Sequence, residues 1–381
     1  MENHSKLPHV GTTIFTVMSA LAQEHRAINL SQGFPNFPTS EALHQLVYQY
    51  MRQGYNQYAP MAGVPLLRQR IADKIAAMYG TNVDPDSEIT ITAGGTQALF
   101  SAITAFIRPG DEVIIFEPAY DSYAPSVEVN GGKVAPYTLQ APDYRINWEE
   151  VAQLISPLTR MIIINTPHNP TGTILKQEDL LALEKLTAGT NILVLSDEVY
   201  EHLVFDGLSH QSVLRFPALR ARSLAVYSFG KTFHHTGWKI GYCVAPPELT
   251  VEFRKVHQFN VFAVNTPIQY ALADFMANPA EYLSLPDFFQ QKRDFFLRAM
   301  AGSRLRPLAC EGTYFQLVDY SAISDEPDVQ FVRKLITDFG VAAIPVSVFY
   351  GTPPPGDRVI RLCFAKTEET LQQAGELLNK V

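Results

Sequence analysis

Cysteine is scarce in this sequence, with only three among 381 residues. Cys243, Cys310 and Cys363 lie far apart, in the apolar segments GYCVA, LACEG and RLCFA. This spacing is typical of buried free thiols and argues against both a disulfide framework and a cysteine-based metal site. The sequence therefore favours a protein of a reducing compartment, and we expect no bound metal.

Basic residues are also few, and no run of them is long enough to follow a nucleic-acid backbone. Thirty basic against 38 acidic side chains give a formal net charge of −8, so we expect no nucleic-acid partner. Long apolar runs are missing as well, since no stretch approaches the ~18 uninterrupted apolar residues of a membrane helix. The first ten residues, MENHSKLPHV, lack the apolar core of a signal peptide. The sequence therefore predicts a soluble, cytoplasmic protein with no membrane partner.

Short apolar segments alternate with stretches of helical period through the middle of the chain. We expect strands at residues 88–92, 112–116, 161–165, 192–196, 224–227 and 241–244. Helices are expected between them, for example at 96–107, 177–187 and 247–258. Because the strands show no clean polar alternation, both faces of their sheet should be covered by helices. This pattern predicts an α/β fold with a mostly parallel sheet.

The two ends of the chain have a different pattern. A long helical stretch from 265 to 301 should break at the Asn278-Pro279 pair, where we place a domain boundary. After it, strands are expected at 314–320, 341–345 and 359–364, around a helix at 328–339. The predicted division is an N-terminal arm with part of the small domain (1–45), a large domain (46–278) and a C-terminal small domain (279–381). The arm should pack against the C-terminal domain.

Polar turns follow the predicted strands, at the sheet edge where parallel folds bind ligands. The first of these turns, AGGTQA, places two glycines before a helix and contains Gly95, Thr96 and Gln97. Backbone N–H groups at such a helix start bind anions, and phosphate is the expected ligand. An ordinary strand-to-helix turn capped by Thr96 is the alternative.

The turn SFGKT places Lys231 directly after an apolar strand. It resembles the end of a nucleotide-binding P-loop, but the glycine that a P-loop requires five positions before Gly230 is Ala225 here. A nucleoside-triphosphate site is therefore excluded. Two interpretations of Lys231 remain. It forms a covalent link to a carbonyl cofactor, or it is a solvated surface lysine.

Asp197 follows the buried strand ILVLS, where an unpaired carboxylate would be costly. A protonated pyridine nitrogen would be a suitable partner, and an arginine in a structural ion pair is the alternative. The neighbouring Glu198 should point to the opposite face and support the scaffold.

Three further residues suit an aromatic cofactor. Asn169, in HNPTG, and Tyr200, in DEVYE, can each donate a hydrogen bond to a phenolate oxygen, although NPTG is also a typical β-turn. Tyr120 offers a flat ring for stacking, and core packing is its alternative role.

Taken together, NTPHNPTG, SDEVYE and SFGKTFHHTGWKIGY resemble the class I/II aminotransferases, enzymes of fold type I that depend on pyridoxal 5′-phosphate. The resemblance runs from the N-terminal arm to IRLCFAK. GTTIFTVMSALA, INLSQGFPNFP and NQYAPMAGVPLLR are most similar to the branch of kynurenine, glutamine and methionine aminotransferases, and within it to the bacterial methionine aminotransferases.

This resemblance implies a role for each matching residue. Lys231 would attach the cofactor and carry the proton, Asp197 would pair with the ring nitrogen, and Tyr200 completes the expected catalytic set. Asn169 and Tyr200 would contact the ring oxygen and Tyr120 would stack on the ring. The phosphate would be held by Gly95, Thr96, Gln97, Ser228 and Lys239, and by Tyr58 of a second subunit in a homodimer. Arg361 would clamp the substrate carboxylate beside Gly33 and Asn169.

The resemblance also suggests a substrate class. Phe15, Phe34, Tyr123 and Phe262 would form an apolar wall, which favours methionine and other apolar or aromatic amino acids with a 2-oxo acid as acceptor. Ala263 stands where kynurenine aminotransferases carry histidine, so kynurenine is less favoured. Two alternatives stay open: a β-lyase acting on cystathionine or cysteine S-conjugates, and a non-catalytic ligand-binding module with the same fold.

Overall fold

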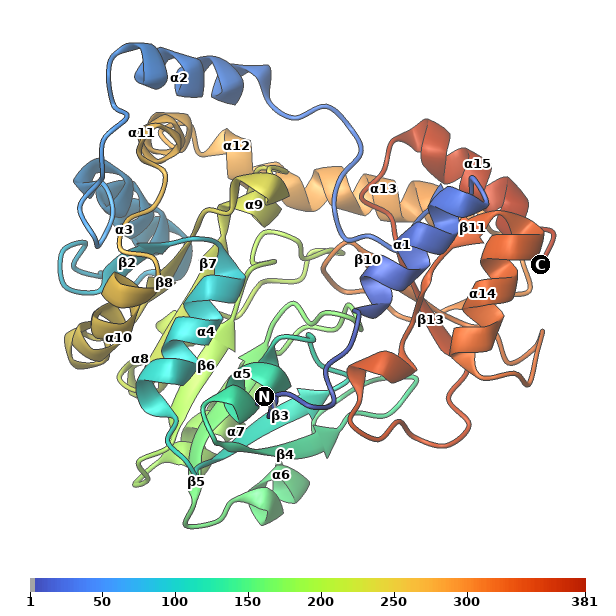
Figure 1. Ribbon diagram of the computed structural model, residues 1–381, viewed down its shortest axis with the longest axis horizontal. Coiled ribbons are helices and arrows are strands. Elements are labelled where there is room, and N and C mark those ends of the chain that lie inside the picture. The colour runs from blue at the N-terminus through green and yellow to red at the C-terminus, as the bar shows by residue number, and fades with distance from the viewer. Residues whose placement is uncertain (1–3) are drawn as a thin grey trace.

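The computed structural model describes residues 4–381 and is built around a seven-stranded sheet (Figure 1). The strand order is β2-β8-β7-β6-β5-β3-β4. Strands β3 to β7 pair in parallel, and only β8 runs antiparallel to its neighbours β2 and β7. The bounds are β2 (Ile89–Thr92), β3 (Glu112–Glu117), β4 (Lys133–Thr138), β5 (Thr159–Asn165), β6 (Leu193–Asp197), β7 (Ser223–Ser228) and β8 (Gly241–Val244). The prediction of an α/β fold with a mostly parallel sheet is confirmed.

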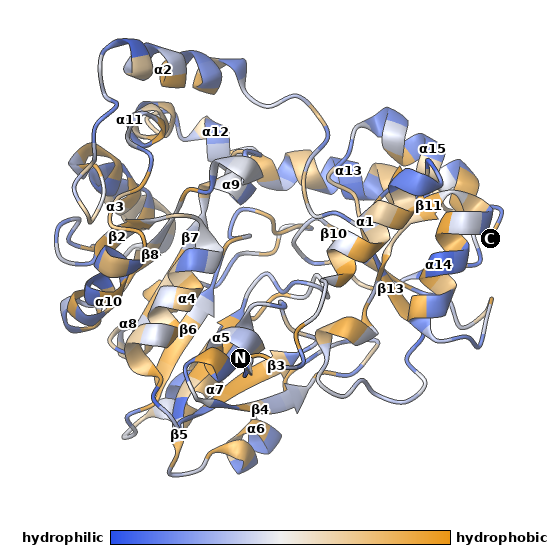
Figure 2. Cartoon of the chain, in the orientation of Figure 1, coloured by the Kyte–Doolittle hydropathy of each residue, from blue (hydrophilic) through white to orange (hydrophobic). Residues whose placement is uncertain are grey.

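Both faces of this sheet are buried, as the lack of polar alternation predicts. In β6, Leu193 and Leu195 face one apolar core and Val194 faces the other. The first core is covered by α4 (Gly95–Phe106), α5 (Tyr123–Val129) and α10 (Pro247–Asn260). The second lies under α3 (Pro65–Tyr79), α6 (Trp148–Leu154), α7 (Gln177–Thr187), α8 (Pro217–Arg220) and α11 (Thr266–Phe275). Figure 2 shows the apolar character of β3 and β6 between these layers.

A second, smaller sheet lies beside the first and carries the end of the chain. Its order is β12-β13-β10-β9, all antiparallel. Its elements are β9 (Arg306–Pro307), β10 (Phe315–Asp319), β12 (Ile344–Pro345), β13 (Val359–Cys363), with α13 (Leu285–Ala299), α14 (Asp328–Phe339) and α15 (Glu368–Leu378). The arm helix α1 (Ile14–Glu24) packs on α14, and β1 (Ile28–Asn29) pairs with β11 (Val341–Ala342) (Figure 1). The expected packing of the arm against the C-terminal part is confirmed.

Besides the two-residue strands β1 and β9, which were not predicted, two details of the secondary structure differ from the prediction. Strand β4 was not expected, because Pro136 and Lys133 weaken its strand pattern; both are tolerated since β4 is an edge strand. The single strand expected at 341–345 is two strands, β11 and β12, because the chain changes sheets at Ala343. Three short 3-10 turns, at Val213–Arg215, Thr236–Trp238 and Ser347–Phe349, complete the described elements.

The division into domains remains a proposal, and the ends of the helices help to locate its boundaries. α11 ends at Phe275, and Asn278-Pro279 precedes the short α12 (Ala280–Leu283), so a boundary at 279 falls between helices. The boundary expected after residue 45 instead falls inside α2 (Glu41–Arg52), which packs on α11. We therefore propose that the large domain begins before Glu41. Within residues 4–381, no helix has the length and apolarity that crossing a membrane requires.

Candidate active site

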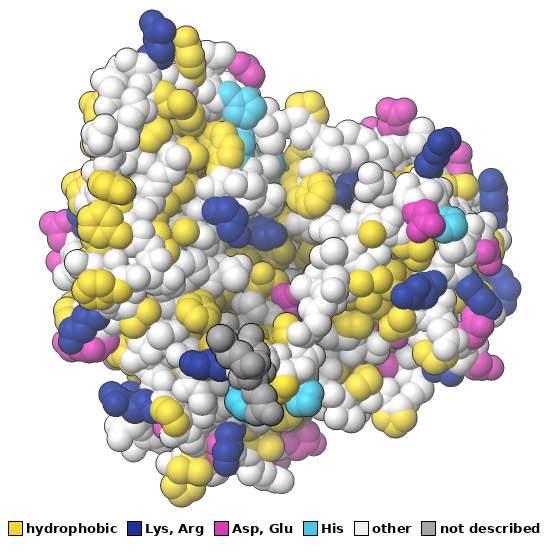
Figure 3. Space-filling model, in the orientation of Figure 1, with side chains coloured by type: hydrophobic (Ala, Val, Ile, Leu, Met, Phe, Trp, Pro, Cys, Tyr) yellow, Lys and Arg dark blue, Asp and Glu magenta, His cyan; other side chains and the backbone are white. Residues whose placement is uncertain are grey.

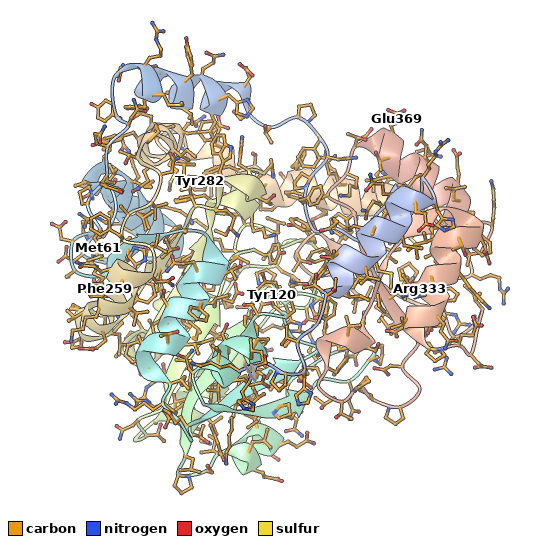
Figure 4. The ribbon with its side chains drawn as sticks, in the orientation of Figure 1. Met61, Tyr120, Phe259, Tyr282, Arg333 and Glu369 are labelled. Atoms are coloured by element: carbon orange, nitrogen blue, oxygen red, sulfur yellow. The ribbon has the colours of Figure 1, made fainter. Side chains whose placement is uncertain are left out.

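A cavity of about 270 Å³ lies at the carboxyl ends of β5, β6 and β7, where the small domain meets the large one. Tyr120 is labelled near the centre of Figure 4, between the two parts of the molecule. The structure brings twelve of the predicted residues together on the wall of this cavity. They are Phe15, Gly33, Gly95, Thr96, Tyr120, Asn169, Asp197, Tyr200, Ser228, Lys231, Lys239 and Arg361.

The turn before α4 has the shape of an anion cradle. Gly94 has a φ of 83°, a value that glycine adopts without strain, and Gly95 opens the helix. A Cβ on Gly241 would lie 3.0 Å from the carbonyl carbon of Gly94 and 3.1 Å from the nitrogen of Gly95, so only glycine lets these strands approach. A Cβ on Gly94 would lie 3.4 Å from the Lys239 Nζ. The Lys239 side chain therefore lies close to Gly94, the residue that precedes the first turn of α4, where an anion would also meet the free N–H groups of the helix.

Lys231 lies on the short helix α9 (Phe229–Thr232) and points into the cavity. Its Nζ donates to the hydroxyl of Tyr314 at 3.0 Å and to the carbonyl of Gly33 at 3.4 Å. Burial lowers the pKa of Lys231 to about 8, and Lys239 and Arg361 add to this effect. Lys231 is thus close to the balance between its charged and neutral forms near neutral pH, which suits a group that gives and takes protons.

Asp197 is buried at the end of β6 and has no cationic partner within hydrogen-bonding distance among residues 4–381. Its carboxylate accepts from the hydroxyl of Tyr123 at 2.6 Å and from the backbone N–H of Val199 at 3.3 Å. Burial raises the pKa of Asp197 to about 6, against the effect of these two donors. The arginine ion pair offered as its alternative role is therefore not formed.

Arg361 is buried on β13 and is held rigidly. It donates to the Oδ1 of Asn169 at 2.8 Å and to the carbonyl of Ser31 at 3.3 Å. Its guanidinium carbon lies 3.8 Å from the ring centroid of Phe315, and the rings of Phe15 and Phe349 lie 5.4 and 5.3 Å away. Its Nε is buried and has no hydrogen-bond partner among residues 4–381. A guanidinium that lines the cavity, with no carboxylate within ion-pair distance in the described part of the chain, fits the carboxylate of a small substrate.

The structure places five predicted site residues away from the cavity wall. Tyr123 lies behind Asp197 and holds it, rather than forming a wall for the substrate. The side chain of Gln97 turns back to the Ala93 N–H and Ser101, so only its backbone can face a phosphate. Phe34 is exposed beneath Lys366, whose Nζ lies 4.9 Å from its ring. Tyr58 and Phe262 are exposed and contact each other, with ring centroids 5.3 Å apart.

Three further residues belong to the site although the sequence did not indicate them. Tyr314 accepts from Lys231, and Phe315 supports Arg361. Asn165 donates to the Asp197 carbonyl at 2.9 Å and accepts from the Asn169 N–H at 2.8 Å, which joins two of the polar turns. Asn165 could have been found from its place at the end of a predicted strand. Nothing in EGTYFQL distinguishes Tyr314 and Phe315 from ordinary core residues.

These features fit a phosphorylated pyridine cofactor. The helix start with Lys239 suits a phosphate, the unpaired Asp197 suits a protonated ring nitrogen, and the unpaired Lys231 suits a carbonyl carbon. The fold and the site together define an enzyme that depends on pyridoxal 5′-phosphate.

Comparison with known proteins narrows this class to one family. Residues 25–378 match the family Aminotransferase class I and II, and the chain belongs to this family. It is 56% identical to a methionine aminotransferase of Escherichia coli (strain K12), over 99% of this chain and 98% of that protein. It is 34% identical to human kynurenine–oxoglutarate transaminase 1, over 94% and 93% of the two chains.

Solved structures give the same result. A crystal structure from Escherichia coli, described as identifying a methionine aminotransferase function, has a TM-score of 0.98 and 55% identity, with both chains fully covered. N-succinyldiaminopimelate aminotransferase from Mycobacterium tuberculosis has a TM-score of 0.95 and 33% identity, also with full coverage. The protein is therefore an aminotransferase of fold type I, which uses pyridoxal 5′-phosphate and acts on amino acids and 2-oxo acids.

Proposed function

We propose that this aminotransferase takes methionine, and other amino acids with apolar or aromatic side chains, as its amino donors. The observation that carries this proposal is the composition of the cavity wall. Phe15 and Phe315 supply rings beside Arg361, and Tyr120 adds a third ring to the wall. Among residues 4–381, the lining has no basic side chain other than Lys231, Lys239 and Arg361, and each of these already has a role. The 56% identity to the Escherichia coli methionine aminotransferase supports the same substrate.

The residues that would hold the cofactor follow from their places in the cavity. Gly95, Thr96, Ser228 and Lys239 would bind its phosphate, with the Gln97 backbone. Asp197 would pair with the ring nitrogen and Tyr120 would lie on the ring. Asn169 and Tyr200 would donate to the ring oxygen. When bound, pyridoxal phosphate supplies a carbonyl group that takes up the amino group and a ring that withdraws electrons from the substrate α-carbon.

The chain's own residues bind the substrate and move its proton. Arg361, beside Asn169 and Gly33, would bind the α-carboxylate and so fix the position of the α-carbon. The Lys231 Nζ, with its pKa of about 8, would take the proton from that carbon and deliver it on the cofactor side. Tyr314 would orient Nζ through its 3.0 Å hydrogen bond. A 2-oxo acid would then bind to the same groups and receive the amino group in the reverse sequence, which gives ping-pong kinetics.

We also propose that the enzyme is a homodimer. Large apolar side chains are exposed together on α2, on the following loop and near the end of α10. Tyr58 is 83% and Phe259 is 90% exposed, with Tyr48, Met51 and Phe262 nearby in the chain. Figure 3 shows apolar side chains gathered over α2, α3 and α10, and Figure 4 labels Met61 and Phe259 at this edge. A second copy covering this patch would bury Tyr58 at the interface, from where it could reach the partner's phosphate. A cytoplasmic location is part of the same proposal.

A panel of amino donors against several 2-oxo acids tests the substrate proposal. Methionine, leucine and phenylalanine should give the highest kcat/KM, and aspartate the lowest. A preference for aspartate would overturn the proposal. Release of ammonia and a thiol from cystathionine, without formation of a new amino acid, would instead favour the β-lyase alternative. Sedimentation of the wild type against Phe259→Asp tests the dimer, which this charge should weaken.

A further inference from the structure

The main-chain carbonyls of residues 31–34, which follow β1, each accept a hydrogen bond from a side-chain cation. We call these four residues the wall segment, because Gln32 and Gly33 line the cavity. The pairs are Arg361 Nη2 to Ser31 at 3.3 Å, Lys366 Nζ to Gln32 at 3.3 Å, Lys231 Nζ to Gly33 at 3.4 Å, and Lys366 Nζ to Phe34 at 2.7 Å. The place of the wall segment is therefore linked to two cations of the site and to Lys366.

Lys366 differs from the other two cations because it does not line the cavity. It lies between β13 and α15, and only 3% of the residue is exposed. Among residues 4–381, no carboxylate lies within ion-pair distance of its Nζ, and the carbonyls of Gln32 and Phe34 are the acceptors of its hydrogen bonds. The ring of Phe34 lies 4.9 Å from the same Nζ. This buried cation is thus directed at the wall segment alone.

Gly33, between the two carbonyls that Lys366 holds, packs closely on the site. A Cβ on Gly33 would lie 2.7 Å from the Phe315 Cζ, and Phe315 is the ring that covers Arg361. The Gly33 carbonyl also accepts from the hydroxyl of Tyr314, the same hydroxyl that contacts Lys231. A shift of the wall segment would therefore change the surroundings of the arginine and of the lysine.

We propose that Lys366 is a positioning residue for the substrate carboxylate. Its ammonium holds the carbonyls on both sides of Gly33 and so keeps the wall segment in the shape that places Arg361 for binding. This inference rests on the proposed aminotransferase site, in which Arg361 binds the carboxylate that amino acids and 2-oxo acids share. A site already held in its binding shape loses less conformational freedom when the ligand enters, so release of the wall segment weakens binding.

The cofactor cradle should not depend on Lys366. Among residues 4–381, no hydrogen bond joins the wall segment to Gly94 or to the first turn of α4. Tyr314 still contacts Lys231 when Lys366 is replaced, because that bond does not involve the ammonium. Lys366 therefore acts on substrate binding more than on cofactor binding or on the proton transfer.

The test compares Lys366→Met with the wild-type holoenzyme, because methionine keeps an unbranched apolar side chain and removes the ammonium. The calorimetric Kd of 4-(methylthio)butanoate, a methionine analogue without the amino group, should rise about tenfold, since two charge-assisted hydrogen bonds to the wall segment are lost. The KM for methionine should rise by a similar factor, with kcat changed less than about threefold. The Kd of pyridoxal phosphate for the cofactor-free protein should stay within about twofold of the wild-type value.

Lys334→Met is the matched control. It makes the same substitution in α14 of the small domain, where the Lys334 side chain is 57% exposed and pairs with Glu326. It should leave the Kd of the analogue and the KM for methionine unchanged. If Lys366→Met does not fold, Lys366→Gln takes its place with the same expected directions, because its neutral and shorter side chain also releases the wall segment.

The outcomes separate the role of Lys366 from the proposed function. An unchanged Kd and KM in the Lys366 variant, with a wild type that reacts with methionine, would overturn the positioning role. Equal losses of analogue and cofactor binding, together with a lower free energy of unfolding, would show that Lys366 only supports the fold, which also overturns it. A wild type that neither binds the analogue nor transfers the amino group of methionine would instead overturn the proposed function.

Discussion

Two groups of buried charges differ in the partners that they have. At the cavity, at the carboxyl ends of the central strands, Asp197, Lys231 and Arg361 have only neutral groups within hydrogen-bonding distance among residues 4–381. Between α3 and the central sheet, a cluster that we call the buried network pairs each charge directly. Its members are Lys74, Tyr79, Glu198, Glu201, His210, Tyr227 and Tyr242.

The pKa values of Asp197 and Glu201 differ in the same way as their partners do. Burial raises the pKa of both Asp197 and Glu201, but Lys74, His202 and Tyr79 outweigh burial at Glu201 and lower its pKa to about 2. At Asp197 no such cation is in contact, and the pKa rises to about 6. Charges on the network side stabilise the fold in pairs, whereas charges on the cavity side are left for the cofactor and the substrate to satisfy. The following substitutions test this comparison, from the largest expected effect to the smallest.

Lys231→Ala should lower the turnover of every donor by about 10⁴-fold, because it removes the group that carries the proton. Steady-state assays check this, together with loss of the visible absorbance of bound cofactor after dialysis. The free energy of unfolding of the cofactor-free protein should change by less than about 1 kcal/mol, because burial already disfavours the charge on Lys231. A much larger loss of stability would contradict the comparison.

Lys74→Met should have its main effect on stability. It leaves the Glu201 carboxylate buried beside the hydroxyls of Tyr79 and Tyr242 and the ring of His202, whose pKa burial lowers to about 3, so no lysine remains to pair with it. Urea unfolding should show a loss of about 3–5 kcal/mol. Adding Glu201→Gln should recover part of this loss, and a double-mutant cycle measures the coupling. If each single change costs less than about 1 kcal/mol, the network does not stabilise the fold as we infer.

Asp197→Asn should stabilise the cofactor-free protein at neutral pH while it removes most of the activity. The pKa of Asp197 is raised from 3.8 to about 6, so the native state binds this proton more tightly than the unfolded chain does. Its contribution to stability therefore falls as pH rises from 3.8 to 6. Urea unfolding should show a gain of about 1–3 kcal/mol for the variant at pH 8 and little difference below pH 4.

The sign is opposite for Glu201, which makes it the control. Its pKa is lowered from 4.5 to about 2, so its stabilising effect is present above pH 4.5 and is lost as pH falls toward 2. Glu201→Gln should therefore destabilise the protein at pH 8. A lower stability of cofactor-free Asp197→Asn at pH 8 would show that Asp197 is structural like Glu201.

The cavity side of this comparison was largely predictable from the sequence, and the network side was not. Asp197 and Lys231 each follow an apolar strand, and parallel strands end at one edge, so their meeting could be inferred without knowing any contact. Lys74 and Glu201 meet across 127 positions, and Tyr314 reaches Lys231 across 83. Such contacts depend on how helices and the small domain pack, which local patterns do not specify. Tyr123 was assigned to the substrate wall for the same reason.

Tyr123→Phe gives the smallest and most specific effect. The Tyr123 hydroxyl donates to the Asp197 Oδ2 at 2.6 Å, and this bond lowers the pKa of Asp197 against burial. Its removal should raise that pKa, at a cost of about 1 kcal/mol to the ionised carboxylate. The acid limb of the kcat/KM profile should then move to higher pH by somewhat less than about one unit.

Tyr120→Phe is the matched control, because it removes a hydroxyl three positions away that contacts Thr96 and not Asp197. Its acid limb should stay where the wild type has it, even if kcat/KM changes at every pH. A shift of the acid limb in both variants would point to a general disturbance of the loop at 120–123. A shift of the acid limb in Tyr123→Phe alone would mean that the neutral Tyr123 hydroxyl sets the pKa of Asp197. A cationic partner in its place would compete with the ring nitrogen that Asp197 is expected to bind.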